Sequence, residues 1–287
     1  MKKIYLLIII LLPLLVQSQK SDKDNFISAS DLIETIIEKT GVSPIPNTVD
    51  VIKEGDPATP VKGIVTCMFP TMEVLKKAVE NKCNLVIAHE PLYYNHLDQT
   101  EKLQQDSVYL KKKKFILDNG LVVWRFHDYI HSMEPDAIIT GMIAKLGWEK
   151  YQAKDSPYKF IFPEMTLTAL LENLKKTFPK PRFNVVGNPE MKLTKVAYVP
   201  GASGSDVHMQ VLRDPEIDVV IAGEVPQWET YEYVRDAVTQ GEKKAIIFLG
   251  HINSEESGMR YCADWLKGFI KDTPIYFIES GSSYWTY

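Results

Sequence analysis

Cysteine is scarce in this 287-residue chain, and no two cysteines stand at the short spacing of zinc or redox motifs. Cys67, Cys83 and Cys262 each lie alone in an apolar or helical stretch. An odd number of widely separated cysteines does not make a disulfide framework. We therefore expect buried free thiols, with room for one bridge at most.

An excess of positive charge is also missing. The chain has 33 Lys and Arg side chains against 37 Asp and Glu side chains, which gives a formal net charge of −4. Its one basic block, residues 111–114, falls within a predicted helix and is expected to be a solvated helix face. A mildly acidic domain is a poor candidate for binding nucleic acid or an anionic membrane, so we expect neither as a partner.

A phosphate-binding loop is absent as well. The turn at 201–204, GASG, follows a predicted strand but lacks the Lys and Ser or Thr of a P-loop. It also lacks the full glycine pattern of a dinucleotide-binding turn. Nucleotide binding through this turn is therefore not expected.

The longest apolar run lies at the N-terminus. Lys2 and Lys3 precede an almost wholly apolar stretch at 4–16, and residues 16–18 are compact enough for signal peptidase. This layout predicts a signal peptide at residues 1–18 and a secreted or periplasmic protein without a membrane partner after cleavage. The alternative is a retained anchor or a buried helix. Cleavage would change the net charge from −4 to −6, because 31 basic and 37 acidic side chains remain.

Short β-rich runs alternate with helical patterns along the mature chain, which predicts an α/β fold with mainly parallel sheets. The strand at 85–88, LVIA, has the continuous apolar pattern of a strand buried on both faces. Other strands are predicted at 61–69, 121–126, 159–162, 183–186, 196–199, 219–222, 245–249 and 275–278. Helices are predicted at 30–40, 105–118, 135–146, 166–177, 206–212 and 227–238, with further helices starting at 71 and, capped by Ser254, near 254.

Two units of the chain share one plan. Residues 61–89 and 196–222 each form a strand, a helix and a strand, and an acidic residue and a proline follow each unit. This suggests an internal duplication and two related α/β lobes. We expect a discontinuous first lobe, residues 28–130 with 245–287, that carries most of the candidate site. The second lobe is expected at 131–244.

Three histidines follow predicted strands. His89 and His127 come directly after strands, and His251 follows another strand after one glycine. Ligands of open α/β sheets bind at the carboxyl ends of strands, so we expect the three imidazoles at one edge of one sheet. Imidazoles joined by Glu90 and Glu255 form a ligand set for Zn²⁺, Mn²⁺ or Fe. His96 and His208 lie outside this edge and are expected to be ordinary surface residues.

Five short motifs are spread over nearly the whole mature chain, and together they resemble one known family. They are NTVD at 47–50, NLVIAHEPL at 84–92, WRFHDYIH at 124–131, AGEV at 222–225 and GHINSEESG at 250–258. They resemble, in this order, the family's WDNVG-type segment, its strand ending in HHP, its AHTNLD-type segment, its TGE and its GHxxSE. The family is that of the type 2 GTP cyclohydrolase I-like, or NGG-one-interacting-factor-three-like, proteins. The resemblance implies a toroidal homohexamer with a dinuclear metal site.

The resemblance further implies a set of metal ligands: His89, Glu90, His131, His251 and Glu255. Two of them depart from the family pattern, because Glu90 replaces its second histidine and His131 replaces its aspartate. Both replacements can bind metal, so we expect two divalent transition-metal ions (Zn, Mn or Fe) with an altered preference. The alternatives are that Asp128 takes the role of the lost aspartate or that only one ion binds tightly. His127 matches the family histidine and is expected to orient a ligand or carry a proton.

Three functions are compatible with this pattern. The first is a metal-dependent hydrolase that uses metal-bound hydroxide on an unknown small-molecule ester, phosphoester or amide, with His127 and Glu255 as catalytic residues. The second is a non-catalytic metal-binding or metal-storing hexameric ring. The third is an α/β domain whose histidines only hydrogen-bond to strand ends. Export argues against GTP as the substrate, because nucleoside triphosphates are scarce outside the cytoplasm.

Overall fold

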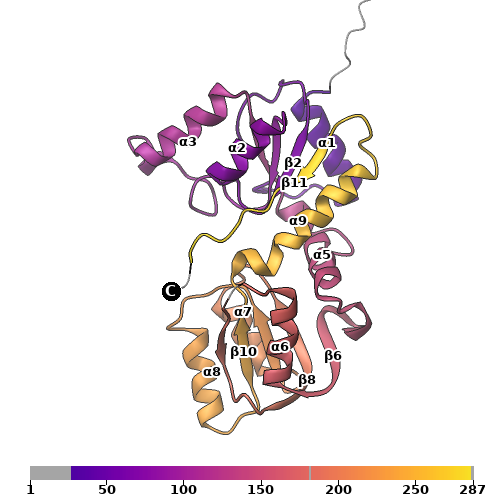
Figure 1. Ribbon diagram of the computed structural model, residues 1–287, viewed down its shortest axis with the longest axis vertical. Coiled ribbons are helices and arrows are strands. Elements are labelled where there is room, and N and C mark those ends of the chain that lie inside the picture. Colours follow the sequence, from indigo (N-terminus) through magenta and orange to yellow (C-terminus); the bar gives the residue numbers. More distant parts are fainter. Residues whose placement is uncertain (1–26, 181, 286–287) are drawn as a thin grey trace, which may run out of the picture.

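The computed structural model describes residues 27–180 and 182–285, which form two α/β lobes (Figure 1). The first lobe has a sheet of five strands in the order β1 (Ile52–Glu54), β4 (Val122–Arg125), β3 (Leu85–Ala88), β2 (Ile64–Cys67) and β11 (Ile275–Phe277). The second lobe has a sheet of six strands in the order β5 (Gln152–Ala153), β6 (Ser156–Thr166), β8 (Lys192–Val199), β9 (Val219–Ala222), β10 (Ala245–Phe248) and β7 (Asn184–Val186). The expected α/β class is confirmed.

The first sheet is buried on both faces, as the apolar run LVIA of β3 predicts. Alternate residues such as Leu85 and Ile87 pack under α1 (Ala29–Thr40) and α9 (His251–Lys267). The residues between them, Val86 and Ala88, pack under α2 (Met72–Glu80) and α3 (Ser107–Asp118). The strands β2, β3 and β4 run parallel, as does β11 beside β2, and β1 is antiparallel at the edge.

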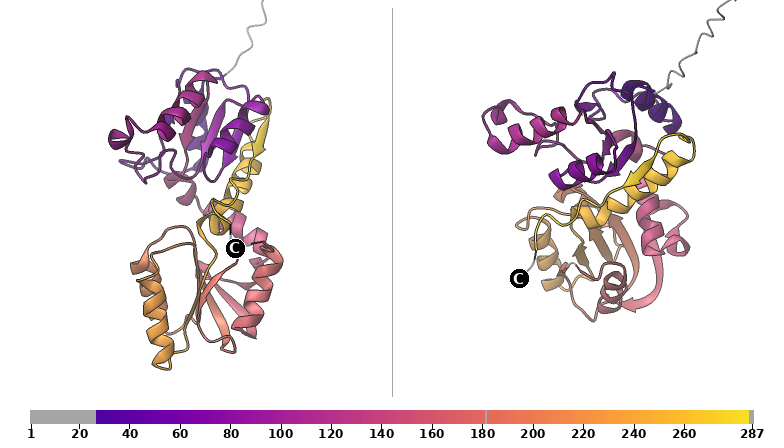
Figure 2. Two further views of the ribbon diagram at one scale, coloured as in Figure 1. Left: turned by 60° about the vertical axis from the view of Figure 1, so that its left-hand side comes forward. Right: turned by 45° about the horizontal axis from the view of Figure 1, so that its top comes forward.

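Helices cover the second sheet in the same way (Figure 2). One face packs on α5 (Ala137–Leu146) and α6 (Leu167–Thr177), and the other on α7 (Ser205–Arg213) and α8 (Thr230–Thr239). Here β8, β9 and β10 are parallel. The outer strands β5, β6 and β7 pair antiparallel, so the second sheet is more mixed than the sequence predicts.

The boundary between the lobes differs from the prediction. We expected residues from 245 onward in the first lobe, but β10 pairs with β9 in register from Ala245 to Phe248 and belongs to the second sheet. The chain therefore returns to the first lobe along α9, which runs obliquely from one lobe to the other (Figure 1). The reason is that residues 245–248 have their apolar neighbours in β9 and β7, a pairing that periodicity alone does not reveal.

The two lobes are held together by close packing of α5 against α9. Gly141 and Gly258 lie at this contact, and a Cβ atom on Gly258 would come within 2.4 Å of Ile138 Cα. A Cβ atom on Gly141 would lie 2.5 Å from the carbonyl oxygen of Ser257. The helices approach each other closely because these positions carry no side chain.

All three cysteines are buried free thiols, as expected. Within residues 27–180 and 182–285, no helix has the length and apolar character needed to cross a bilayer. The signal peptide expected at residues 1–18 lies outside the described residues.

The packing of α5 on α9 predicts the effect of one added methyl group. Gly258→Ala should lower the free energy of unfolding by about 1–3 kcal/mol, because overpacking outweighs the gain in helix propensity of about 1 kcal/mol. Urea denaturation followed by circular dichroism measures this change. Ala144→Gly, at an exposed position of α5, reports the propensity effect alone. A higher free energy of unfolding in Gly258→Ala would show that α5 and α9 can move apart to accommodate the methyl group.

Candidate metal centre

The carboxyl end of β3 supplies the first two residues of the site. The backbone N–H groups of His89 and Glu90 donate to the carbonyl oxygens of Cys67 and Met68, at 3.1 and 2.9 Å, which extends the pairing with β2. His89 is completely buried and Glu90 is 6 % exposed. Polar side chains at this depth need partners, because an unpaired buried charge is costly.

The carboxyl end of β4 supplies two further histidines through the short helix α4 (Asp128–His131). His127 precedes this turn and His131 ends it. The Asp50 carboxylate holds the turn by accepting hydrogen bonds, at 2.8–2.9 Å, from the backbone N–H groups of His127, Asp128 and Tyr129. Burial raises the pKa of Asp50, although these three hydrogen bonds act in the opposite direction. Sequence analysis matched the segment that contains Asp50 but did not find this role.

The third pair of site residues lies on the first turn of α9. This helix begins at His251, four residues earlier than the cap at Ser254 predicts, and Glu255 follows one turn later. Ser254 lies inside the helix, where its hydroxyl donates to His251 O and accepts from Gly201 N. A Cβ atom on Gly201 would lie 2.4 Å from Glu255 Oε1, so the absence of a side chain at 201 leaves room for the carboxylate.

The site lies between two sheets and not at one edge of one sheet, which corrects the sequence expectation. His89 and His127 follow strands of the first sheet, whereas His251 follows β10 of the second. The ends of both sets of strands face each other because α5 and α9 hold the lobes together. Strand ends are recognisable in a sequence, but which strands share a sheet depends on pairing between distant segments.

Four imidazole rings are oriented by an oxygen atom at Nδ1. His89 Nδ1 lies 3.2 Å from the carbonyl oxygen of Phe126. The Nδ1 atoms of the other three rings lie 3.0 Å from carboxylate oxygens, in the pairs His127–Asp128, His131–Asp136 and His251–Glu224. In a neutral imidazole, an acceptor at Nδ1 holds the ring proton there and leaves Nε2 with a free lone pair. This is the state in which histidine binds a metal ion.

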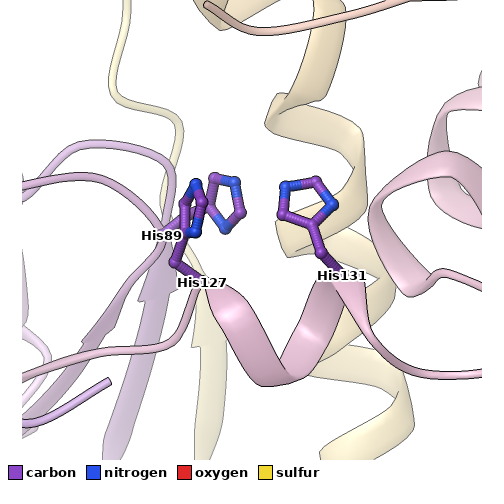
Figure 3. Close-up of side chains that lie close together, drawn as sticks. All are labelled: His89, His127 and His131. Carbon is purple, nitrogen blue, oxygen red and sulfur yellow. The ribbon is translucent and has the colours of Figure 1, made fainter. Parts of the chain in front are cut away.

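The rings then converge. His127 and His131 stand at the two ends of α4, with the ring of His89 beside them (Figure 3). The centroids of these three rings are 4.7–5.0 Å apart. His251 Nε2 lies 3.1 Å from both Glu90 Oε1 and Glu255 Oε2. Buried His89 Nε2 has no hydrogen-bond partner and lies 3.8 Å from Glu255 Oε2.

Two overlapping groups of ligand atoms are close enough to hold a metal ion. One consists of His89, His127 and His131, and the other of His89, Glu90 and Glu255, with the ligand atoms of each group within 4.8 Å of one another. Imidazoles with carboxylates suit Zn²⁺, Mn²⁺ or Fe. The predicted ligands therefore lie together, and His127, which the sequence suggested for another role, joins them.

Without a metal, the charges of this cluster compensate one another. Burial lowers the pKa of His251, but contacts with Glu224, Glu255 and Glu90 outweigh burial and raise it to about 12. Burial raises the pKa of Glu90, but the hydrogen bond with His251 and the nearby imidazoles lower it to about 2. Burial holds the pKa of His89 well below its usual value. Glu90 is therefore ionised and His89 neutral, as a cation site requires, whereas His251 carries an Nε2 proton that a bound ion would replace.

Arg125 is a buried residue of the site that sequence analysis missed. Its side chain is 1 % exposed and donates to the carbonyl oxygens of His89, at 3.1 Å, and of His96. Its Nη2 atom lies 3.3 Å from Glu90 Oε2. Arg125 therefore holds one oxygen of Glu90 and leaves Oε1 directed at His251. The sequence contained one indication of this role. Arg125 lies at the end of an apolar strand, and an arginine in such a position is rarely buried without a partner.

Three other residues fall in places that the sequence did not predict. Asp128 is turned away from the cluster, because its second oxygen accepts from Thr48 Oγ1 and Val49 N while the first holds His127. His96 is exposed, as expected, but it also lines the cavity beside the site. His208 is completely buried and not at the surface, and burial lowers its pKa to about 4.

The cluster lies beside a cavity of about 640 Å³. Glu90, His127, His131, His251 and Glu255 line its polar part. A small molecule in this space would have direct access to the imidazole and carboxylate side chains. Cavities of this size are typical of small-molecule sites.

Comparison with known proteins relates this chain to one family. The model of Duf34/NIF3 (NGG1p interacting factor 3) matches residues 47–282. A Clostridium acetobutylicum protein named "GTP cyclohydrolase 1 type 2 homolog" is 26% identical over 236 residues, which cover 77% of this chain and 84% of that protein.

Solved structures show the same fold. The Staphylococcus aureus hypothetical protein SA1388 matches with a TM-score of 0.71 and 16% identity, covering 92% of this chain and 100% of the other. A Bacillus cereus protein related to NIF3 matches with a TM-score of 0.70 and 14% identity, covering 91% and 99%. The resemblance inferred from the five motifs is confirmed.

The contact between Asp136 and His131 predicts how loss of the Asp136 carboxylate affects zinc binding. Asp136 Oδ1 is held by the backbone N–H groups of Ile138 and Ile139, so Oδ2 is the oxygen that faces His131. In Asp136→Asn an amide N–H group would face Nδ1 and move the ring proton to Nε2. Zinc binding should weaken about 10- to 100-fold in competition with a chelator.

Asp106→Asn is the matched control for this substitution. Asp106 caps α3 through the same kind of contact, at 2.9 and 3.0 Å, with the backbone N–H groups of Val108 and Tyr109. This variant should retain the zinc affinity of the unaltered chain. Equal zinc affinity in Asp136→Asn would mean that His131 takes no part in binding or needs no carboxylate.

Proposed function

Because the chain belongs to the Duf34/NIF3 family, we propose that it binds divalent transition-metal ions at this cluster and acts as a metal-dependent hydrolase. The observation that carries the proposal is the common orientation of the four imidazoles. Each has an oxygen acceptor at Nδ1, and three of the four acceptors are carboxylates. Carboxylate–histidine pairs of this kind orient metal-binding histidines and increase their basicity.

We assign two ion positions, for Zn, Mn or Fe. His89 and His131 form one position, and His127 lies beside it with its Nε2 free to accept a proton. His251 forms the other with Glu90 and Glu255, whose oxygens both lie 3.1 Å from its Nε2. Glu255 Oε2 also lies 3.8 Å from His89 Nε2, so Glu255 stands between the two positions. The position with two histidines favours Zn or Fe, and the carboxylate-rich position also suits Mn.

Bound ions would supply Lewis-acid activation of water and of the substrate. The residues of this chain have separate tasks around them. His127 is 24 % exposed at its side chain and faces the cavity, so it can accept a proton there, and Asp128 orients its ring. Buried Glu255 holds its carboxylate between the two ion positions. The substrate would be an ester, phosphoester or amide.

Elemental analysis tests the metal part of the proposal. Protein purified without a histidine tag should contain or take up close to two equivalents of Zn, Mn or Fe per chain. His89→Ala and His251→Ala should each lose at least one equivalent, because each removes an Nε2 ligand. His208→Gln, which changes a histidine away from the cavity, should retain both. Less than about a tenth of an equivalent in the unaltered chain, with no uptake on addition, would contradict metal binding.

Turnover tests the hydrolase part. The metal-loaded protein should hydrolyse at least one member of a set of phosphate, carboxylate-ester and amide substrates, and His127→Ala should lower kcat about 10²- to 10⁴-fold while keeping most of the metal at the second position. Full metal content with no turnover would favour the alternative function, a non-catalytic metal-binding or storage ring.

We also propose export and assembly into a homohexamer. The basic start and apolar run at residues 1–18 support export, and the family resemblance supports the ring. Native and intact mass spectrometry of protein expressed from the full-length gene should find six copies of a chain that starts near residue 19, in the periplasmic or secreted fraction. An uncleaved chain in the cytoplasm would contradict export, and a monomer would contradict the homohexamer.

A further inference from the structure

The cavity beside the cluster has an apolar wall that the metal ligands do not use. This wall is contributed by α5 and the second lobe, and consists of Ile139, Ala197, Val199, Ala202, Val207 and Val211. The histidines and carboxylates of the site line the same cavity. A ligand that fills the cavity would therefore contact both polar side chains and hydrocarbon.

One residue of this wall, Val207, is 40 % exposed, as is Tyr158, which also lines the cavity. Tyr158 is fixed, because its hydroxyl donates to Asp136 Oδ2 at 3.3 Å. Apolar side chains that line a concave surface next to convergent polar groups are characteristic of ligand sites.

Outside the candidate metal ligands, the cavity has little positive charge to hold a polyanion. Among the described residues that line it, Lys159 is the single lysine or arginine, and its Nζ atom already lies 3.0 Å from Asp214 Oδ2. Asp136 adds a carboxylate to the same surface. Triphosphates are usually bound by several cationic side chains or by a glycine-rich loop, and neither lines this cavity.

We propose that the cavity binds a compact organic molecule with a branched or aromatic apolar body and one hydrolysable group, and that it discriminates against nucleoside triphosphates. The position of the hydrolysable group rests on the proposed function, whereas the preference for an apolar body rests on the wall. In the reaction, the oxygen of water bonds to the acyl carbon or phosphorus and the bond to the leaving oxygen or nitrogen breaks. The leaving group departs with the proton that His127 accepted from water.

Phenylphosphonate and methylphosphonate differ in the size of their apolar group, and neither is hydrolysed. Their relative affinities therefore test the preference of the cavity for an apolar ligand. Isothermal titration of the zinc-loaded full chain should show phenylphosphonate binding at least about tenfold more tightly than methylphosphonate, because a ring buries more apolar surface. GTP should bind more weakly than phenylphosphonate. Equal affinities for the two phosphonates, or tighter binding of GTP, would overturn the proposal.

A charge on the apolar wall provides the second test. Val207→Asp should reduce the advantage of phenylphosphonate to less than about threefold without changing zinc content. An aspartate in the first turn of α7 is compatible with the helix. Val108→Asp is the matched control, since Val108 is a 60 % exposed valine near the start of α3 that does not line the cavity. An undiminished advantage in Val207→Asp would exclude this wall as the binding surface.

The zinc content of each sample separates this proposal from the proposed function. If the chain binds no zinc, the metal proposal fails, and the wall is then tested with 1-anilinonaphthalene-8-sulfonate, which has an apolar body and one negative charge. Its fluorescence in the metal-free full chain should rise with the unaltered protein and with Val108→Asp, and much less with Val207→Asp. The same signal in all three proteins would overturn the proposal independently of any metal.

Discussion

The contact between α5 and α9 is the constraint on which the rest of the structure depends. Gly141 and Gly258 let the two helices approach closely, and α9 extends from the carboxyl end of β10 into the core of the first lobe. Neither sheet alone holds the candidate site, because its side chains follow strands of both. A loss of packing here would separate His89 from Glu255 even if each lobe kept its own fold.

The second constraint is electrostatic. Carboxylates and imidazoles are buried together, and every imidazole of the cluster has a fixed acceptor at Nδ1. Arg125 adds a buried positive charge that holds one oxygen of Glu90. Removing one partner of such a network leaves an uncompensated buried charge, which costs more than the pair itself contributes. The orientation of the rings is therefore set by their surroundings, before any ion binds.

Much of the fold and of the site could be predicted from the sequence, because both depend largely on local patterns. The apolar runs at 85–88 and 219–222 are strands with those bounds, and the histidines that follow strands lie in the site. Properties that depend on distant segments could not be predicted. The placement of β10 in the second sheet follows from its pairing with β9, and the burial of Arg125 follows from acceptors on three separate residues. The same limit applies to His208, whose burial comes from tertiary packing that no local pattern shows.

Glu255 belongs to α9 yet rests against Gly201 of the second lobe and faces His89 of the first. An ion held by these two side chains would join the lobes as a crosslink does. By thermodynamic linkage, its binding free energy would add to the stability of the contact between the lobes, and that contact would in turn increase the affinity for the ion. The contact between the lobes and the candidate metal centre would then form one cooperative unit, and metal supply would determine how rigidly the two halves of the molecule are connected.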